Sequence, residues 1–301
     1  MLVTGPRHPG PQPAVSRSGP LPGPSTELIE TAHGVRLERL VTGAGDPVTV
    51  FAHGLAGDIA GTRPLGSAVA GRRVFFQQRG HGRSDTPPGP WSFADLAADL
   101  AAVADLSGAT RAVGVSMGAA ALCRLLAQQP DRFARVVLFL PAPLDGTRPP
   151  AARARLERLL AALGDPGDAA ALRVGHQAAG VGDAALAEAV GSELPLVIRA
   201  TPPGRAYVRQ RVEQLRRDGL APELGTLWPA PAVPDERALR AFEGRALVLG
   251  CTGDEVHPAA VAERVAACLP GAELHVYDHP AVLWTHRQDL RERISTFLNA
   301  H

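Results

Sequence analysis

Residues 112–126, AVGVSMGAAALCRLL, decide the fold of this 301-residue chain. The run begins as a short apolar strand, and from Gly118 onward it has the small and apolar side chains of a buried helix. Gly114 and Gly118 flank Ser116 in the pattern G-x-S-x-G. A serine on a sharp turn between strand and helix needs small neighbours, because larger side chains would clash there. The stretch therefore predicts a nucleophile elbow that presents Ser116 near the positive end of a helix.

Strand and helix patterns alternate on both sides of this elbow. Residues 26–43 read as a hairpin with a turn at His33-Gly34, and residues 92–108 as a helix with Ser92 as N-cap and Asp95 at the third helical position. Several strand-like runs are apolar on both faces, which is typical of a mostly parallel sheet covered on both sides. The further strands are expected within 47–54, 72–82, 135–143, 245–258 and 272–278, and the further helices at 259–269 and 284–300.

This alternation stops near Pro143 and resumes near Arg245. Between these residues, amphipathic helices are predicted at 151–163, 184–194 and 205–220. We therefore expect residues 26–143 and 241–301 to form the core and residues 144–240 to form a helical cap. Apolar residues in 195–208 and 224–233 would either line a pocket or pack the cap onto the sheet. Residues 1–25, rich in Pro, Gly and Ser, are predicted to be a disordered tail.

Composition excludes several classes of function. The formal net charge of +1 gives no reason to expect nucleic acid or a membrane surface as a partner. Chemistry on a lysine amine is excluded because all 31 basic residues are Arg. The three unpaired cysteines and the absence of a signal-like apolar segment predict a cytoplasmic protein. The histidines lack zinc-ligand spacing, so neither a metal nor a cofactor is expected, and the oligomeric state stays open.

Two further motifs accompany the elbow. His53-Gly54-Leu55 follows an apolar strand, and residues 79–85 read RGHGRSD. Together with G-x-S-x-G, these motifs resemble the α/β-hydrolase family over nearly the whole chain after the tail. The resemblance implies the α/β-hydrolase fold, a mostly parallel eight-stranded sheet with helices on both faces and a cap insertion. It also implies an oxyanion hole formed by the backbone N–H groups of Leu55 and Met117, with His53 and His81 supporting their loops.

A serine nucleophile needs a histidine base, and the histidine needs a carboxylate to orient it. In the family the order along the chain is serine, acid, histidine. Asp254, in the sequence Cys251-Thr252-Gly253-Asp254 after a predicted strand, resembles the acid of the family. Asp145, which follows the strand at 135–143, is the alternative acid.

The histidine is expected in the loop after the last strand, as in the family. His279 lies near that position and is our predicted base, although Asp precedes it and Pro follows it. His286, at the beginning of the final predicted helix, is the alternative. His257 is assigned to the beginning of the helix at 259–269. A third alternative is that neither His279 nor His286 reaches Ser116.

The predicted activity is that of a serine hydrolase acting on an ester or thioester of a small organic substrate through an acyl-enzyme on Ser116. Serine at the elbow argues against haloalkane dehalogenases and epoxide hydrolases, which use Asp there. One alternative is an acyltransferase or cyclase of a biosynthetic pathway that uses the same site. The other is a non-catalytic ligand-binding protein with this fold. Three cap arginines, Arg199, Arg205 and Arg209, would either meet an anionic substrate group or form a solvated face.

Overall fold

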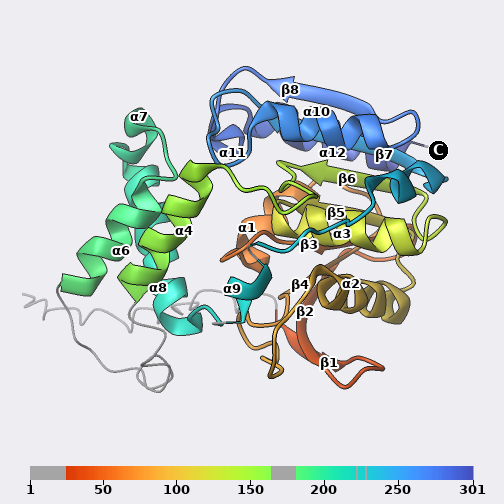
Figure 1. Cartoon of the computed structure of the whole chain (residues 1–301), viewed down its shortest axis with the longest axis horizontal. Coiled ribbons are helices and arrows are strands. Elements are labelled where there is room, and N and C mark those ends of the chain that lie inside the picture. Colours follow the sequence, from red (N-terminus) through yellow and green to blue (C-terminus); the bar gives the residue numbers. More distant parts are fainter. Residues whose placement is uncertain (1–24, 164–180, 222, 228, 301) are drawn as a thin grey trace, which may run out of the picture.

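The structure, a computed structural model, describes residues 25–163, 181–221, 223–227 and 229–300. An eight-stranded sheet forms its centre, with strand order β1-β2-β4-β3-β5-β6-β7-β8 (Figure 1). β1 and β2 pair in antiparallel fashion with each other and with β4, and all the remaining pairs are parallel. This is the mostly parallel sheet that the sequence predicts. The strands are β1 (Glu27–Glu30), β2 (Arg36–Thr42), β3 (Val48–Ala52), β4 (Arg72–Phe76), β5 (Arg111–Val115), β6 (Arg135–Phe139), β7 (Arg245–Cys251) and β8 (Glu273–Tyr277).

The central strands β3 and β6 are buried along their whole length and are mostly apolar, because both of their faces are covered. Every residue of β3 and of β6 is buried. Successive side chains of a strand point to opposite faces. Val50 and Leu138 accordingly pack in one apolar cluster, whereas Phe51 and Phe139 pack in the other. The core therefore has two apolar layers, one on each side of the sheet.

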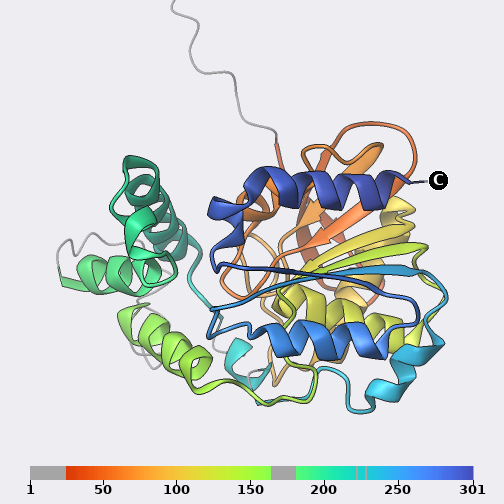
Figure 2. The same ribbon diagram turned by 90° about the horizontal axis from the view of Figure 1, so that it is seen from above.

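Helices cover both layers (Figure 2). On one face lie α2 (Phe93–Ser107), α3 (Met117–Gln128) and α10 (Ala259–Cys268). On the other lie α1 (Ile59–Thr62), the 3-10 turn η1 (Arg63–Gly66) and α12 (Arg287–Asn299). None of the helices in the described part of the chain is long and apolar enough to cross a membrane.

The beginning of α2 agrees with the sequence prediction, whereas the beginning of the last helix does not. Ser92 and Asp95 form the predicted capping box at the beginning of α2. The predicted final helix at 284–300 is instead two helices, α11 (Val282–Thr285) and α12, separated by His286. His286 has φ −128° and ψ 27°, outside the helical range, so it interrupts the helix that the sequence pattern alone would continue.

Between β6 and β7 the chain leaves the sheet and forms a helical lobe at one end of the molecule (Figure 1). Its helices are α4 (Pro150–Leu163), α6 (Val181–Gly191), α7 (Leu196–Arg199) and α8 (Pro202–Asp218), which we call the cap. The cap has an apolar cluster of its own, which includes Leu159, Leu186 and Leu215 together with Ala56 of the core. The chain returns through α9 (Leu224–Leu227) and η3 (Glu236–Ala241), whose leucines pack against the core. The predicted tail at 1–25 lies, except for Ser25, outside the described residues.

Candidate active site

Ser116 occupies a strained turn between β5 and α3. Its φ of 50° and ψ of −109° are unfavourable for a residue with a side chain. The flanking glycines make this turn possible. A Cβ at Gly114 would lie 2.6 Å from Cα of Ala119, and one at Gly118 would lie 2.4 Å from the carbonyl oxygen of Ala52. The G-x-S-x-G spacing thus reflects close backbone packing around the half-buried hydroxyl of Ser116.

The imidazole beside Ser116 is that of His257. His257 Nε2 lies 2.9 Å from Ser116 Oγ, and His257 Nδ1 lies 3.2 Å from Asp254 Oδ2. Nδ1 faces a carboxylate, which only accepts hydrogen bonds, so Nδ1 carries the proton and Nε2 accepts from the serine hydroxyl. The three side chains form the order hydroxyl, imidazole, carboxylate in which a serine becomes a nucleophile.

Asp254 is held in its ionised form by its surroundings. Burial alone would raise the pKa of this carboxyl. The hydrogen bond from the His257 ring and the bonds from the backbone N–H groups of Val256 and His257 outweigh burial and lower the pKa to about 2. Oδ1 accepts both backbone bonds, which leaves Oδ2 for the ring. The carboxylate therefore holds the loop through its backbone hydrogen bonds and also orients the imidazole.

The sequence contained a signal for His257 that our assignment to the next helix overlooked. Helix α10 begins at Ala259, with Pro258 as its N-cap at φ −55° and ψ 140°. A residue that precedes proline is disfavoured in the helical region. Pro258 therefore keeps His257 in the loop, three residues after Asp254, where the carboxylate can reach its ring.

The two histidines predicted as base lie elsewhere. His286 Nε2 is 3.2 Å from Asp278 Oδ1, and its Nδ1 is 2.8 Å from Thr285 Oγ1. His279 is exposed, and its ring centroid lies 6.4 Å from that of His286. The structure thus puts His257 where we expected His279. The alternative acid, Asp145, is likewise engaged away from the serine, 2.6 Å from Nη1 of Arg264.

The residues predicted for the oxyanion hole adjoin the serine. Met117 is the first residue of α3, so its N–H has no acceptor within the helix. A Cβ added to Gly54 would lie 3.2 Å from Cβ of Ser116, which shows how closely the turn before Leu55 approaches the nucleophile. We call residues 54–57 the oxyanion turn. The backbone at Gly54 and at Met117 thus lies beside the serine, and it comes from two different strand ends.

His53 and His81 brace the oxyanion turn, as the sequence led us to expect. His53 Nδ1 is 2.8 Å from the carbonyl oxygen of Gly54, and His81 Nε2 accepts a hydrogen bond of 3.2 Å from the N–H of Ala56. Burial lowers the pKa of His53 to about 4 and that of His81 to about 3. Both rings are therefore neutral near pH 7, and each provides one donor and one acceptor to the backbone.

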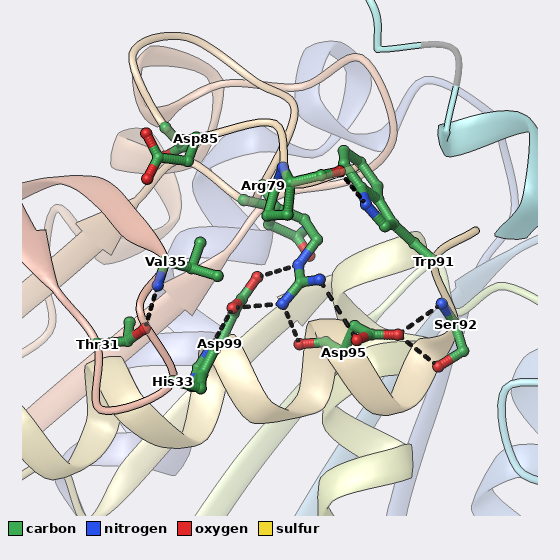
Figure 3. A network of polar contacts seen from close by, with 12 residues as sticks. Thr31, His33, Val35, Arg79, Asp85, Trp91, Ser92, Asp95 and Asp99 are labelled. Atoms are coloured by element: carbon green, nitrogen blue, oxygen red, sulfur yellow. Dashed lines mark hydrogen bonds and ion pairs between the residues drawn. The ribbon is translucent and has the colours of Figure 1, made fainter. Parts of the chain in front are cut away.

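A buried ion pair holds the loop that carries His81 (Figure 3). Arg79 binds Asp99 of α2 through two hydrogen bonds of 2.6 and 2.9 Å, and its guanidinium lies 5.8 Å from the ring centre of Trp91. His33 Nε2 is 2.8 Å from the same carboxylate. The carbonyl of Arg79 is in turn 3.1 Å from His81 Nδ1. The network anchors the RGHGRSD loop to α2 and gives His81 its tautomer.

A cavity of about 770 Å³ lies between the core and the cap, with the serine, His257 and the oxyanion turn in its wall. Most of the other lining side chains are apolar. They come from the core, from α4 and from α8, and include Phe139, Leu156, Leu159, Tyr207, Leu224, Leu227 and Trp284. Residues of both segments proposed to line or pack the cap thus reach the cavity. Among the described residues, no cluster of His, Cys, Asp and Glu is placed to hold a metal ion.

The three cap arginines do not line this cavity. Arg199 binds Glu188, Arg205 donates to the carbonyl of Ala200, and Arg209 is exposed. Other arginines, including Arg211 and Arg287, are present in the wall.

The family model for the alpha/beta hydrolase fold matches residues 47–281. The match spans most of the chain, from β3 to the segment after β8, and includes the elbow and the loop of Asp254 and His257. This protein therefore belongs to the alpha/beta hydrolase fold family.

Individual proteins are similar to this chain over different shares of their length. RutD of Caulobacter segnis, named as a carbamate hydrolase, is 38% identical over 101 residues, which are 32% of this chain and 38% of the relative. Among solved structures, the enol-lactonase of Burkholderia xenovorans LB400 is similar with a TM-score of 0.71 and 21% identity, over 91% of this chain and 100% of the other. The esterase RhEst1 of Rhodococcus sp. ECU1013 gives a TM-score of 0.69 at 21% identity, over 91% and 99% of the two chains. At such identities the structures support the fold alone.

Proposed function

We propose that this protein is a serine hydrolase that cleaves an ester or thioester of a small organic substrate through an acyl-enzyme on Ser116. The observation that carries the proposal is the 2.9 Å contact between His257 Nε2 and Ser116 Oγ, with Asp254 behind the ring. The mostly apolar wall of the cavity favours a substrate whose acyl or leaving group is apolar.

In the first half of the reaction, Ser116 Oγ attacks the carbonyl carbon while its proton passes to His257 Nε2. The negative charge that develops on the carbonyl oxygen is stabilised by the N–H groups of Leu55 and Met117, an effect worth about 3 kcal/mol for each donor. The tetrahedral intermediate then breaks its bond to the leaving group, which takes the proton from His257 and departs as an alcohol or thiol.

In the second half, water attacks the acyl-enzyme and gives one proton to His257. The second tetrahedral intermediate breaks its bond to Oγ, which recovers that proton, and the carboxylic acid is released. Asp254 keeps the Nδ1 proton in place throughout and stabilises the imidazolium that forms twice in each cycle.

Labelling with a fluorophosphonate, followed by intact mass, tests the proposal directly. We expect one adduct on the wild-type protein, none on Ser116→Ala, and very slow labelling of His257→Ala. His279→Ala is the matched control, because it removes an exposed imidazole outside the cavity, and it should label at the wild-type rate. An unlabelled wild-type protein, beside a control hydrolase that reacts, would refute the acyl-enzyme and favour a ligand-binding role.

A panel of p-nitrophenyl esters and thioesters then identifies the substrate class. Incubation with and without an added alcohol or amine separates hydrolysis from acyl transfer, because a transferase would yield the new ester or amide in place of the free acid. Dominance of the transfer product would replace hydrolysis by the acyltransferase or cyclase alternative while leaving the roles of Ser116 and His257 unchanged.

A further inference from the structure

The oxyanion turn contains a chain of two hydrogen-bonded peptide groups that ends at Leu55. The carbonyl of Gly54 and the N–H of Leu55 belong to one planar peptide group, so fixing the carbonyl also fixes the direction of the N–H. The Gly54 carbonyl accepts a hydrogen bond of 2.9 Å from the N–H of Gly57. The N–H of Gly57 shares its own peptide plane with the carbonyl of Ala56.

The cap provides the group that begins this chain. Arg211 of helix α8 donates from Nη2 to the carbonyl oxygen of Ala56 at 2.5 Å, across 155 residues of sequence. Three consecutive bonds therefore lead from the cap to the oxyanion donor: from Arg211 to the Ala56 carbonyl, from Gly57 N–H to the Gly54 carbonyl, and from Leu55 N–H to the oxygen of a bound substrate.

Arg211 is itself held in place. Its Nη1 donates to Oε1 of Gln214, a buried side chain on the next turn of α8. Leu215, beside Gln214, is buried in the apolar cluster of the cap, and the side chain of Ala56 packs into this same cluster. Ala56 has φ 56°, a left-handed conformation that residues other than glycine adopt at a cost in energy. Contacts from the cap thus hold both the side chain and the carbonyl of a strained residue.

The positive charge of the guanidinium also acts on the donor. A hydrogen bond from a cation to a peptide carbonyl draws electrons from that peptide group and strengthens its N–H as a donor, and the effect passes along a hydrogen-bonded chain. At the end of this chain, the N–H of Leu55 would meet the negative charge that develops in the transition state. The stabilisation by the Leu55 N–H is larger in the transition state than in the ground state, because the substrate carbonyl oxygen carries only a partial charge in the ground state.

We propose that Arg211 is a positioning residue for the oxyanion hole, through which the cap sets the direction and strength of the Leu55 N–H donor. The inference depends on the acyl-enzyme function proposed above. It predicts that loss of Arg211 lowers the rate of the chemical step and leaves substrate binding nearly unchanged.

Arg211→Ala tests the proposal, with Arg209→Ala, on the exposed side of the same helix, as the matched control. For fluorophosphonate labelling of Ser116 we expect kinact of Arg211→Ala to fall about 10- to 100-fold with KI within about threefold of wild type. In the hydrolysis of p-nitrophenyl butyrate, kcat should likewise fall while KM stays nearly unchanged. Guanidinium chloride, far below denaturing concentrations, should restore part of kinact in this variant and leave the wild-type value unchanged.

A wild-type kinact in a folded Arg211→Ala variant would overturn the inference, as would a change confined to KI. If that variant fails to fold by circular dichroism, Arg211→Lys and Arg211→Met replace it, since the two side chains are similar in length and differ in charge. We expect kinact of Arg211→Lys to stay within about threefold of wild type and kinact of Arg211→Met to fall about tenfold. Equal kinact values for the two variants would refute the role of the charge. An unlabelled wild-type protein would instead refute the underlying function.

Discussion

Two segments at the same end of the sheet each bring an Asp and a His to an N···O distance of 3.2 Å. We call residues 252–258, after β7, the β7 loop, and residues 278–286, after β8 and including α11, the β8 loop. After β7, His257 Nδ1 lies 3.2 Å from Asp254, and after β8, His286 Nε2 lies 3.2 Å from Asp278. The pairs differ in exposure, since the side chain of Asp254 is 18% exposed and that of Asp278 is 78% exposed. They differ also in direction, because the free nitrogen of His257 faces Ser116 whereas that of His286 faces Thr285.

An Asp–His distance does not by itself define an acid–base pair. Burial of the carboxylate, its bonds to the backbone, and the direction of the second ring nitrogen distinguish the β7 loop from the β8 loop. Equivalent substitutions in the two loops should therefore have different effects.

The largest difference is expected at the base. We expect His257→Ala to lower kcat about 10⁴-fold, because the serine loses the imidazole that lies 2.9 Å from its hydroxyl and is positioned to take its proton. His279→Ala and His286→Ala should leave kcat within about twofold, since neither ring reaches the cavity wall. The measurement is ester hydrolysis with all three variants at equal concentration. A loss of activity confined to His279→Ala would transfer the base to the β8 loop.

The next difference concerns the acids. Asp254→Asn should lower kcat about 10²- to 10⁴-fold, because an amide at this position favours the wrong tautomer of His257. Asp278→Asn removes an exposed partner of His286 and should leave kcat nearly unchanged. Steady-state kinetics at pH 8 compares the two variants. Equal effects of the two substitutions would mean that Asp254 does not orient the base.

Acid stability should separate the same two carboxylates. The pKa of Asp254 is lowered from its ordinary value of 3.8 to about 2, so the folded state binds its proton less readily than the unfolded chain does. This contribution is fully present above pH 3.8 and is lost as the pH falls toward 2. It amounts to about 2 kcal/mol of the free energy of unfolding.

Urea unfolding between pH 5 and pH 2 measures this contribution. The dependence on pH should be weaker in Asp254→Asn than in wild type, and Asp278→Asn should match wild type. A wild-type dependence in both variants would contradict the lowered pKa of Asp254.

The smallest effect is expected from the residue that ends the β7 loop. Pro258→Ala removes the restriction on His257 and allows α10 to extend toward it. The ring would then spend less time beside Ser116, and we expect kinact for the fluorophosphonate to fall about tenfold. Pro280→Ala, at a proline of the β8 segment, is the control. An unchanged kinact in Pro258→Ala would show that the bonds to Asp254 hold the loop without help from the proline.

Much of the fold could be predicted from local sequence. The apolar strands, the capping box of Ser92 and Asp95, and the glycines around Ser116 are all visible as short patterns in the sequence, and the structure contains each of them. The division of the last helix at His286 was missed, because the surrounding residues have a continuous helical pattern.

The site was only partly predictable. Ser116 and Asp254 were predicted from motifs, whereas His279 was predicted from its resemblance to the usual position in the family. His257, which lies beside Ser116, could have been predicted from its position three residues after Asp254 and directly before Pro258. The contact of Arg211 with Ala56 could not, because the two residues are 155 positions apart and meet only after the cap has packed.

The closeness of Asp254 and His257 in sequence has an entropic consequence. Bringing two groups together costs more as the chain between them lengthens, and here only two residues intervene. Closing this short loop therefore costs little chain entropy, and a histidine placed after β8 would need a much longer closure to reach the same carboxylate. Hydrogen bonds from Thr252 to the carbonyl oxygens of Tyr277 and Asp278 then fix the beginning of the loop against the end of β8.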